Sequence, residues 1–197
     1  MANTKKMSVR TIAGLAMLTA IVVVLQLIGA SIRLGTFSVS FVLLPIVIGS
    51  ALYGPWAGAW LGGVFGLVVL LSGDANAFLA MNPVATVLVV MLKGILAGLL
   101  GGLVYRALEK KSRMLAAYGS AVTVPVVNTG IFILGCLAFF IKPISENADA
   151  WGYAGSNGLV YILTVLVGLN FFFELGANII LAPVVVRLIQ VITKKKA

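Results

Sequence analysis

The sequence predicts an all-α integral membrane protein, a compact six-transmembrane-helix bundle with both termini on the cytoplasmic side. Hydrophobic residues make up 61% of the 197 residues and charged residues only 10%, whereas roughly a quarter of the residues in an ordinary soluble domain are charged. Apolar stretches of about twenty residues recur along the chain, and this length crosses a hydrocarbon core of roughly 30 Å. The polar exterior of a soluble domain is missing, so we treat residues 1–197 as a single transmembrane domain.

The six predicted spans cover, in chain order, residues 8–29, 39–53, 56–71, 84–108, 115–141 and 159–192. The second and third spans are short, and only the turn sequence Gly54-Pro55 separates them. Five spans plus a re-entrant hairpin is therefore the alternative. Six spans place both chain ends on one side of the membrane.

The distribution of charge agrees with this orientation. The formal net charge is +9, and basic residues gather at both chain ends and between residues 106 and 113. Basic residues hold the segments next to a span on the cytoplasmic side. The expected outer loops, residues 30–38, 73–82 and 142–157, are less basic. A nucleic-acid partner is less favoured by the net charge, because the basic clusters lie at the edges of apolar stretches.

Small residues recur at every fourth position in three of the predicted spans. This spacing places them on one helix face, where the absence of side chains lets two backbones approach closely. We interpret the glycine ladders of the third and fourth spans as packing surfaces within the bundle, and the alanines of the first span as a face that can seat another helix. The residues are Gly58, Gly62 and Gly66, then Gly94, Gly98 and Gly102, and finally Ala13, Ala16 and Ala20.

Two charged residues lie inside apolar spans, where a charge costs several kcal/mol unless it faces a cavity or a partner. Lys93 falls about 14 Å into the fourth span, and Glu174 lies in the sixth. Asn170, Glu174 and Asn178 follow one another at four-residue spacing and form a polar stripe on an apolar helix.

The fifth span adds Asn128 and Thr129 after Pro125, where the helix lacks a backbone donor. We predict that these groups line one water-accessible pocket together with Lys93 and Glu174. The alternative is interhelical hydrogen bonding, in which Lys93 and Glu174 neutralise each other.

The outer loops supply further candidate binding residues. Asp74, Asn76 and Asn82 lie in a turn-rich segment between the third and fourth spans, which can close over an outward-facing pocket. Arg33 lies in the first outer loop. The alternative for these residues is a solvated loop without a role in binding.

The sequence lacks the common signatures of catalysis. It has no G-x-x-x-x-G-K-[ST] phosphate loop, so the chain does not hydrolyse ATP by that route. It has no histidine, which removes the commonest general base and metal ligand. Cys136 lies in an apolar run and is expected to be a small core residue. We therefore expect no enzyme activity, no cofactor and no metal ion.

Several segments together resemble one family of membrane proteins. The small residues at 16–20 are similar to a docking motif, and residues 44–49 with 52–58 are similar to a connection between the second and third spans. Residues 93–98 and 125–130 look like segments of the fourth and fifth spans. The chain resembles the substrate-binding S component of an energy-coupling factor (ECF) vitamin transporter, in the folate, pantothenate and riboflavin branch.

The resemblance implies a binding subunit in a bacterial or archaeal cytoplasmic membrane, which captures a vitamin or related micronutrient. It implies docking through Ala13, Ala16 and Ala20 on a transmembrane coupling protein, the T component, with two cytoplasmic ATPases that drive inward release. Lys93 and Arg33 favour a small anion such as pantothenate.

Two other classes of protein stay open. One is a stand-alone secondary transporter that uses Glu174 as a proton relay. The other is a structural membrane protein in which Lys93 and Glu174 hold helices together.

Overall fold

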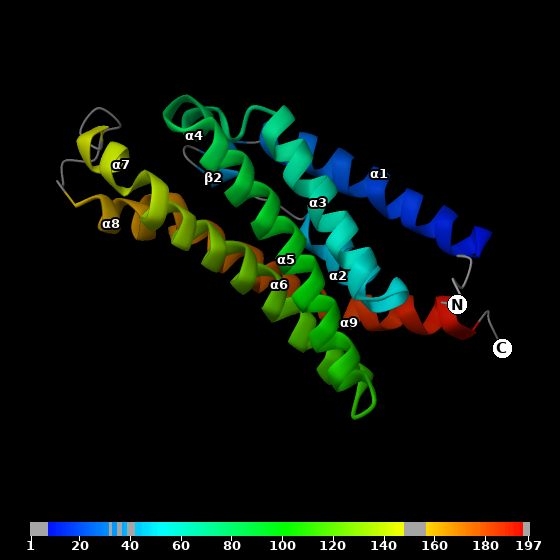
Figure 1. Ribbon diagram of the computed structural model, residues 1–197. Helices are drawn as coiled ribbons and strands as arrows, with labels where there is room; N and C mark the ends of the chain where they lie inside the picture. The colour runs from blue at the N-terminus through cyan, green and yellow to red at the C-terminus, as the bar shows by residue number, and fades with distance from the viewer. Residues whose placement is uncertain (1–7, 32, 35–36, 39–41, 148–156, 195–197) are drawn as a thin grey trace, which may run out of the picture.

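The computed structural model describes residues 8–31, 33–34, 37–38, 42–147 and 157–194, which form a bundle of helices (Figure 1). Two π-helical turns, η1 and η3, continue the helices before them. In chain order the elements are α1 (Val9–Ser31), β1 (Arg33–Leu34), β2 (Phe37–Ser38), α2 (Leu43–Tyr53), α3 (Pro55–Leu71), α4 (Asn76–Met81), α5 (Pro83–Glu109), α6 (Arg113–Gly135), η1 (Cys136–Phe140), α7 (Ile141–Asn147), α8 (Gly158–Tyr161), η3 (Ile162–Gly168) and α9 (Leu169–Lys194).

Within the described residues, four helical segments are long and apolar enough to cross a membrane: Val9–Ala30, Pro83–Glu109, Arg113–Glu146 and Gly158–Val191. They coincide with the predicted first, fourth, fifth and sixth spans, and the prediction of a helical membrane protein is confirmed. The predicted second and third spans are α2 and α3, with 11 and 17 residues, which extend roughly 16 and 26 Å. The count of six spans stays a prediction.

Two of the connections add short elements that the all-α prediction did not include, and the helical fold class stands. β1 and β2 pair antiparallel, with Arg33 opposite Ser38 and Leu34 opposite Phe37. Residues expected to form a turn-rich loop after the third span instead include α4, which has six residues. Strands of two residues and a helix of six are too short for hydrophobic periodicity to indicate.

A tight turn joins α2 to α3. Gly54 has a φ of 96°, a conformation that side chains other than glycine rarely adopt. Pro55 follows at the first position of α3, where its missing N–H leaves no helical hydrogen bond unmade. This turn sends α3 back alongside the bundle.

The two glycine ladders pack against each other, as predicted. A Cβ placed on Gly58 would collide with the carbonyl oxygen of Gly98, and one on Gly62 would collide with that of Gly94. The antiparallel helices α3 and α5 therefore touch backbone to backbone. Ser50 of α2 joins this contact by donating a 3.2 Å hydrogen bond to the Gly98 carbonyl.

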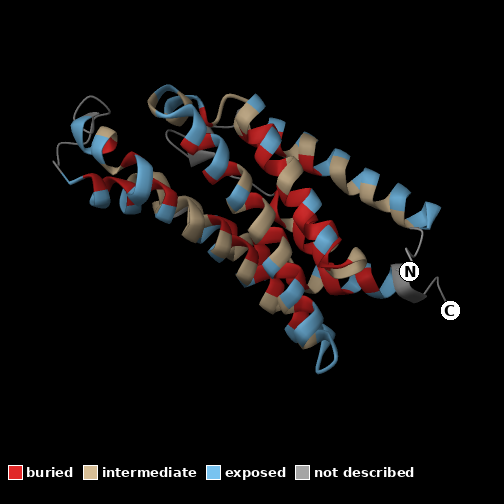
Figure 2. Ribbon diagram, viewed as in Figure 1, coloured by how far each residue is buried: buried red, intermediate tan, exposed pale blue. Residues whose placement is uncertain are grey.

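Buried residues concentrate where α2, α3 and α5 face one another, whereas much of the outer surface of α1 is exposed (Figure 2). Large apolar side chains are exposed on the outer faces, among them Leu71 (78%), Phe172 (67%) and Ile180 (75%). Such surfaces suit contact with lipid tails. Cys136 is fully buried, as expected of a core residue.

The bundle has two distinct ends (Figure 1). The first turn of α1, the last turn of α9 and the α5–α6 turn lie at one end, which we call the terminal end. The β strands, α4 and α7 lie at the other, which we call the α4 end. The described basic residues that flank the spans at positions 106–113 belong to the terminal end.

Candidate binding cavity

A cavity of about 310 Å³ opens between the helices toward the α4 end. This volume lies at the small end of the range for small-molecule sites, roughly 300–1,000 Å³. The lining comes from α1, α3, the α3–α4 turn, α4, α5, α6, η3 and α9. The lining residues are Gln26, Phe65, Val69, Asp74, Ala75, Ala77, Phe78, Val90, Lys93, Asn128, Phe132, Leu166 and Glu174.

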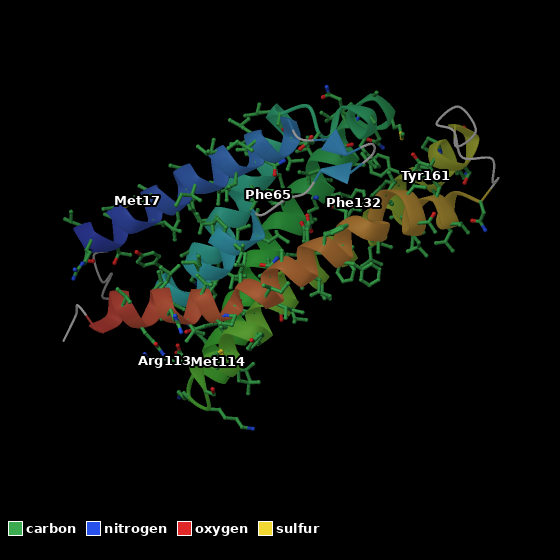
Figure 3. All side chains as sticks on the ribbon, turned by 180° about the vertical axis from the view of Figure 1, so that it is seen from behind. Met17, Phe65, Arg113, Met114, Phe132 and Tyr161 are labelled. Atoms are coloured by element: carbon green, nitrogen blue, oxygen red, sulfur yellow. The ribbon has the colours of Figure 1, made fainter. Side chains whose placement is uncertain are left out.

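Lys93 is the cation among these lining residues. Its ammonium nitrogen lies 5.5 Å from the centroid of the Phe65 ring and 5.4 Å from that of Phe132, close enough for cation–π attraction. Figure 3 labels both rings. The adjacent Gly94 packs on the backbone of α3, and a Cβ there would lie 3.5 Å from the Phe65 ring. The glycine contact therefore brings Lys93 and Phe65 together.

Glu174 and Asn128 bring buried polar groups to the same cavity, and each side chain is 7% exposed. In the described part of the chain, the Asn128 Oδ1 atom has no hydrogen-bond partner. No ion pair or hydrogen bond joins Lys93 to Glu174 among those residues. Buried polar groups are normally hydrogen-bonded, so Asn128 has a free acceptor for a ligand, while Lys93 and Glu174 are also close enough to attract each other.

A hydrogen bond between α1 and the α3–α4 turn borders the cavity. Gln26 is 4% exposed, and its Nε2 atom donates to Asp74 Oδ2 at 2.7 Å. Gly73, with a φ of 88°, permits the turn that presents Asp74. Gln26 was not predicted, although a glutamine inside the first apolar span could have indicated it.

Three phenylalanines form the aromatic part of the lining, and the sequence did not indicate them. Phe78 and Phe132 meet edge to face, with ring centroids 5.5 Å apart and an angle of 80° between the ring planes. Phe78 also packs against Phe140 at 5.2 Å. Phe65, Phe78 and Phe132 can bury the apolar part of a ligand, and Phe140 supports Phe78 from behind the lining.

Several predicted site residues lie elsewhere on α6 and α9. Thr129 and Asn170 are half-buried, and neither lines the cavity. Asn178 is 2% exposed and donates a 2.8 Å hydrogen bond to the backbone carbonyl of Glu174. The Oδ1 atoms of Asn170 and Asn178 are buried without a hydrogen-bond partner among the described residues. Both belong beside the cavity rather than on its lining.

Of the predicted loop residues, Asp74 lines the cavity, whereas Asn76 and Asn82 do not. Asn76 and Asn82 are exposed. Asn82 caps α5, because its Oδ1 atom accepts a 3.1 Å hydrogen bond from the amide of Ala85. Arg33 lies in β1, and its side chain is outside the described part of the structure.

The small-residue face of α1 is exposed at Ala13, Ala16 and Ala20. Ala16 lines a groove between α1 and α3, where Trp60 Nε1 donates a 3.1 Å hydrogen bond to Thr19 Oγ1. The described residues leave this face uncovered, so it is available to another helix. Docking of a partner here stays a prediction.

Comparison with known proteins identifies the family. No curated protein and no solved structure gives a significant match to the chain. The family model described as the substrate-specific component of ECF transporters matches residues 10–186, which is most of the 197 residues. The resemblance is confirmed at this level, and the vitamin branch stays a prediction. The match extends from α1 into α9, and the chain therefore belongs to the family of substrate-specific components of ECF transporters.

Proposed function

We propose that the chain captures a vitamin or related micronutrient in the cavity near the α4 end, as the substrate-binding subunit of an ECF-type ABC importer. In this account the solute enters from outside and is released inward when the chain docks on a T component with two ATPases. The observation that carries the proposal is the pair of buried side chains, Asn128 and Glu174, that line the cavity beside Lys93. A ligand with matching donors and acceptors would complete their hydrogen bonding.

The chemistry of the cavity supports a small solute that has both an anionic group and hydrogen-bond donors. Lys93 would hold a carboxylate by a charge-assisted hydrogen bond. Glu174 and Asp74 would accept hydrogen bonds from hydroxyl or amide groups of the solute. Pantothenate carries a carboxylate, hydroxyl groups and an amide N–H on a small aliphatic frame, so it is our lead candidate.

Titration of the purified protein with pantothenate and panthenol tests this assignment, because panthenol has a hydroxyl group in place of the carboxylate. We expect pantothenate to bind roughly 10- to 100-fold more tightly, since a hydrogen bond to a charged group contributes about 1.5–3 kcal/mol. Lys93→Met should abolish this preference. Lys110→Met, which alters an exposed lysine of the terminal end, should retain it.

Equal affinities for the two compounds in the natural protein would contradict the assignment of an anionic ligand. An unchanged preference in Lys93→Met would contradict the role of Lys93. Either result would leave membership of the family untouched, because that rests on the whole-chain match.

We propose further that α2 and α3 complete six spans and that the terminal end faces the cytoplasm of a bacterial or archaeal cell. The basic residues beside the α5–α6 turn support this orientation. The cavity at the α4 end then faces outward. The exposed alanines Ala13, Ala16 and Ala20 support docking of the T component on α1.

A second function, stand-alone secondary transport, is supported by Glu174, because a buried carboxylate in a membrane cavity can relay protons. Uptake of labelled solute by cells that lack the T component and the ATPases separates the two functions. The importer accumulates no solute in such cells. Proton-driven accumulation that Glu174→Gln abolishes would establish the secondary transporter instead.

A further inference from the structure

A second cavity, of about 420 Å³, lies at the terminal end of the bundle. It is formed by the first turns of α1, the last turns of α2, α5 and α9, and the start of α6. Figure 3 shows Met17 of α1 and Arg113 of α6, both lining residues, at this end. No residue is shared between its lining and that of the solute cavity. Any occupant of this second cavity is therefore separate from the solute.

The polar side of this cavity is basic. Arg10 and Arg113 line it from different helices, and Glu109 is the carboxylate among its lining residues. Tyr105 also lines it and is only 2% exposed, yet its hydroxyl forms no hydrogen bond with any described residue. A buried tyrosine hydroxyl usually finds a partner. Arg10 and Arg113 line the same cavity with exposed side chains, and guanidinium groups favour the oxygens of a phosphate.

The other side of the cavity is apolar and reaches the outer surface of the bundle. Ala13, Met17, Leu52 and Ile189 line it, and Met17 is 68% exposed on α1. A free phosphate ion gains nothing from an apolar wall, whereas an acyl chain attached to the phosphate buries apolar surface against it. Basic pockets between helix ends at the membrane surface bind the head groups of anionic lipids.

We propose that this cavity binds the phosphate head group of an anionic phospholipid such as phosphatidylglycerol. Arg10 and Arg113 hold the phosphate, and the Tyr105 hydroxyl donates a hydrogen bond to it. The acyl chain follows α1 past Met17. The bound lipid links the N-terminal end of α1 to α5 and α6, and so holds in place the helix that carries the exposed alanine face.

Native mass spectrometry of the full chain in detergent tests this proposal, with phosphatidylglycerol or phosphatidylcholine added at equal concentration. We expect phosphatidylglycerol to be retained at least about tenfold better, because it alone of the two carries net negative charge. The double variant Arg10→Gln/Arg113→Gln should lose this preference. Lys110→Gln/Lys111→Gln removes the same charge from an adjacent exposed turn that does not line the cavity, and should keep it.

Tyr105→Phe provides a second variant that removes a single oxygen atom. We expect its affinity for phosphatidylglycerol to fall about 2- to 10-fold, as for the loss of one hydrogen bond. The buried Cys136 should stay protected from a thiol reagent, which shows that this variant is folded.

Glycerol 1-phosphate is the probe for a site that takes the head group alone, and it should not compete with the lipid at equal concentration. The proposal is overturned by any of three results. They are equal retention of the two lipids, equal losses in the two double variants, and competition by glycerol 1-phosphate at the concentration of the lipid.

Discussion

Replacing Gly98 by alanine is expected to destabilise the bundle, because α3 and α5 touch backbone to backbone at this position. The added methyl group would collide with the Gly58 carbonyl and lie 3.1 Å from the amide nitrogen of Ala59. Neither group is a flexible side chain that can turn away. We therefore expect the free energy of unfolding to fall by about 2–3 kcal/mol, in the upper part of the range seen when a group is added to a packed core. For a chain of this size the melting temperature should fall by roughly 4–12 °C.

Alanine substitutions at two other glycines serve as comparisons for the loss of stability at Gly98. A methyl group at Gly66 would lie 2.9 Å from the Val90 carbonyl oxygen and 3.2 Å from the flexible sulfur of Met91, so Gly66→Ala should cost only about 1 kcal/mol. At Gly130 nothing lies within 4 Å of the added methyl group. Gly130→Ala should raise the free energy of unfolding by about 0.4–1 kcal/mol, because alanine restricts the conformations of the unfolded chain.

Thermal unfolding in detergent can be followed with a thiol-reactive fluorophore, because Cys136 is the sole cysteine and is fully buried. The expected order of melting temperatures is Gly130→Ala highest, then Gly66→Ala, then Gly98→Ala. A melting temperature of Gly98→Ala at or above that of Gly130→Ala would refute the backbone contact between α3 and α5.

Three further substitutions test separate parts of the account. Asn128→Ala should weaken solute binding in a titration by about 2- to 10-fold. The control Asn76→Ala changes an exposed residue outside the lining and should leave the affinity unchanged. Equal effects of the two substitutions would remove Asn128 from the site. Asn82→Ala should lower the free energy of unfolding by about 0.5–2 kcal/mol through loss of the helix cap, and should leave the affinity for the solute unchanged. A loss of affinity without a loss of stability would instead make Asn82 a ligand-binding residue. The double variant Ala16→Leu/Ala20→Leu should no longer co-purify with the T component but should still bind solute, and normal co-purification would place docking elsewhere.

The close packing of α3 on α5 could be predicted from the sequence, because glycine at every fourth position leaves a strip of helix backbone without side chains. The gathering of Lys93, Asn128 and Glu174 could be predicted for a different reason. A polar group within an apolar span costs free energy unless it faces a cavity or a partner. Three such groups from three spans have the lowest cost when they share one cavity.

The rest of the cavity lining could not be predicted. Phe65 and Phe132 are apolar residues in apolar spans, and their sequence context does not distinguish them from Phe172, which is 67% exposed. The polar stripe on α9 predicted too many lining residues, because each four-residue step turns a helix by roughly 40°. Glu174 lines the cavity, whereas Asn170 and Asn178 do not.

Identification by mass spectrometry of the small molecule released from the detergent-purified protein tests the central claim most directly. We expect a small polar solute, in near-equal molar amount, from the natural protein and from Lys110→Met. Lys93→Met and Asn128→Ala should lose that solute, with Cys136 still protected from the thiol reagent. A natural protein that releases no solute after growth in vitamin-rich medium, or a solute that stays with Lys93→Met and Asn128→Ala, would contradict the account.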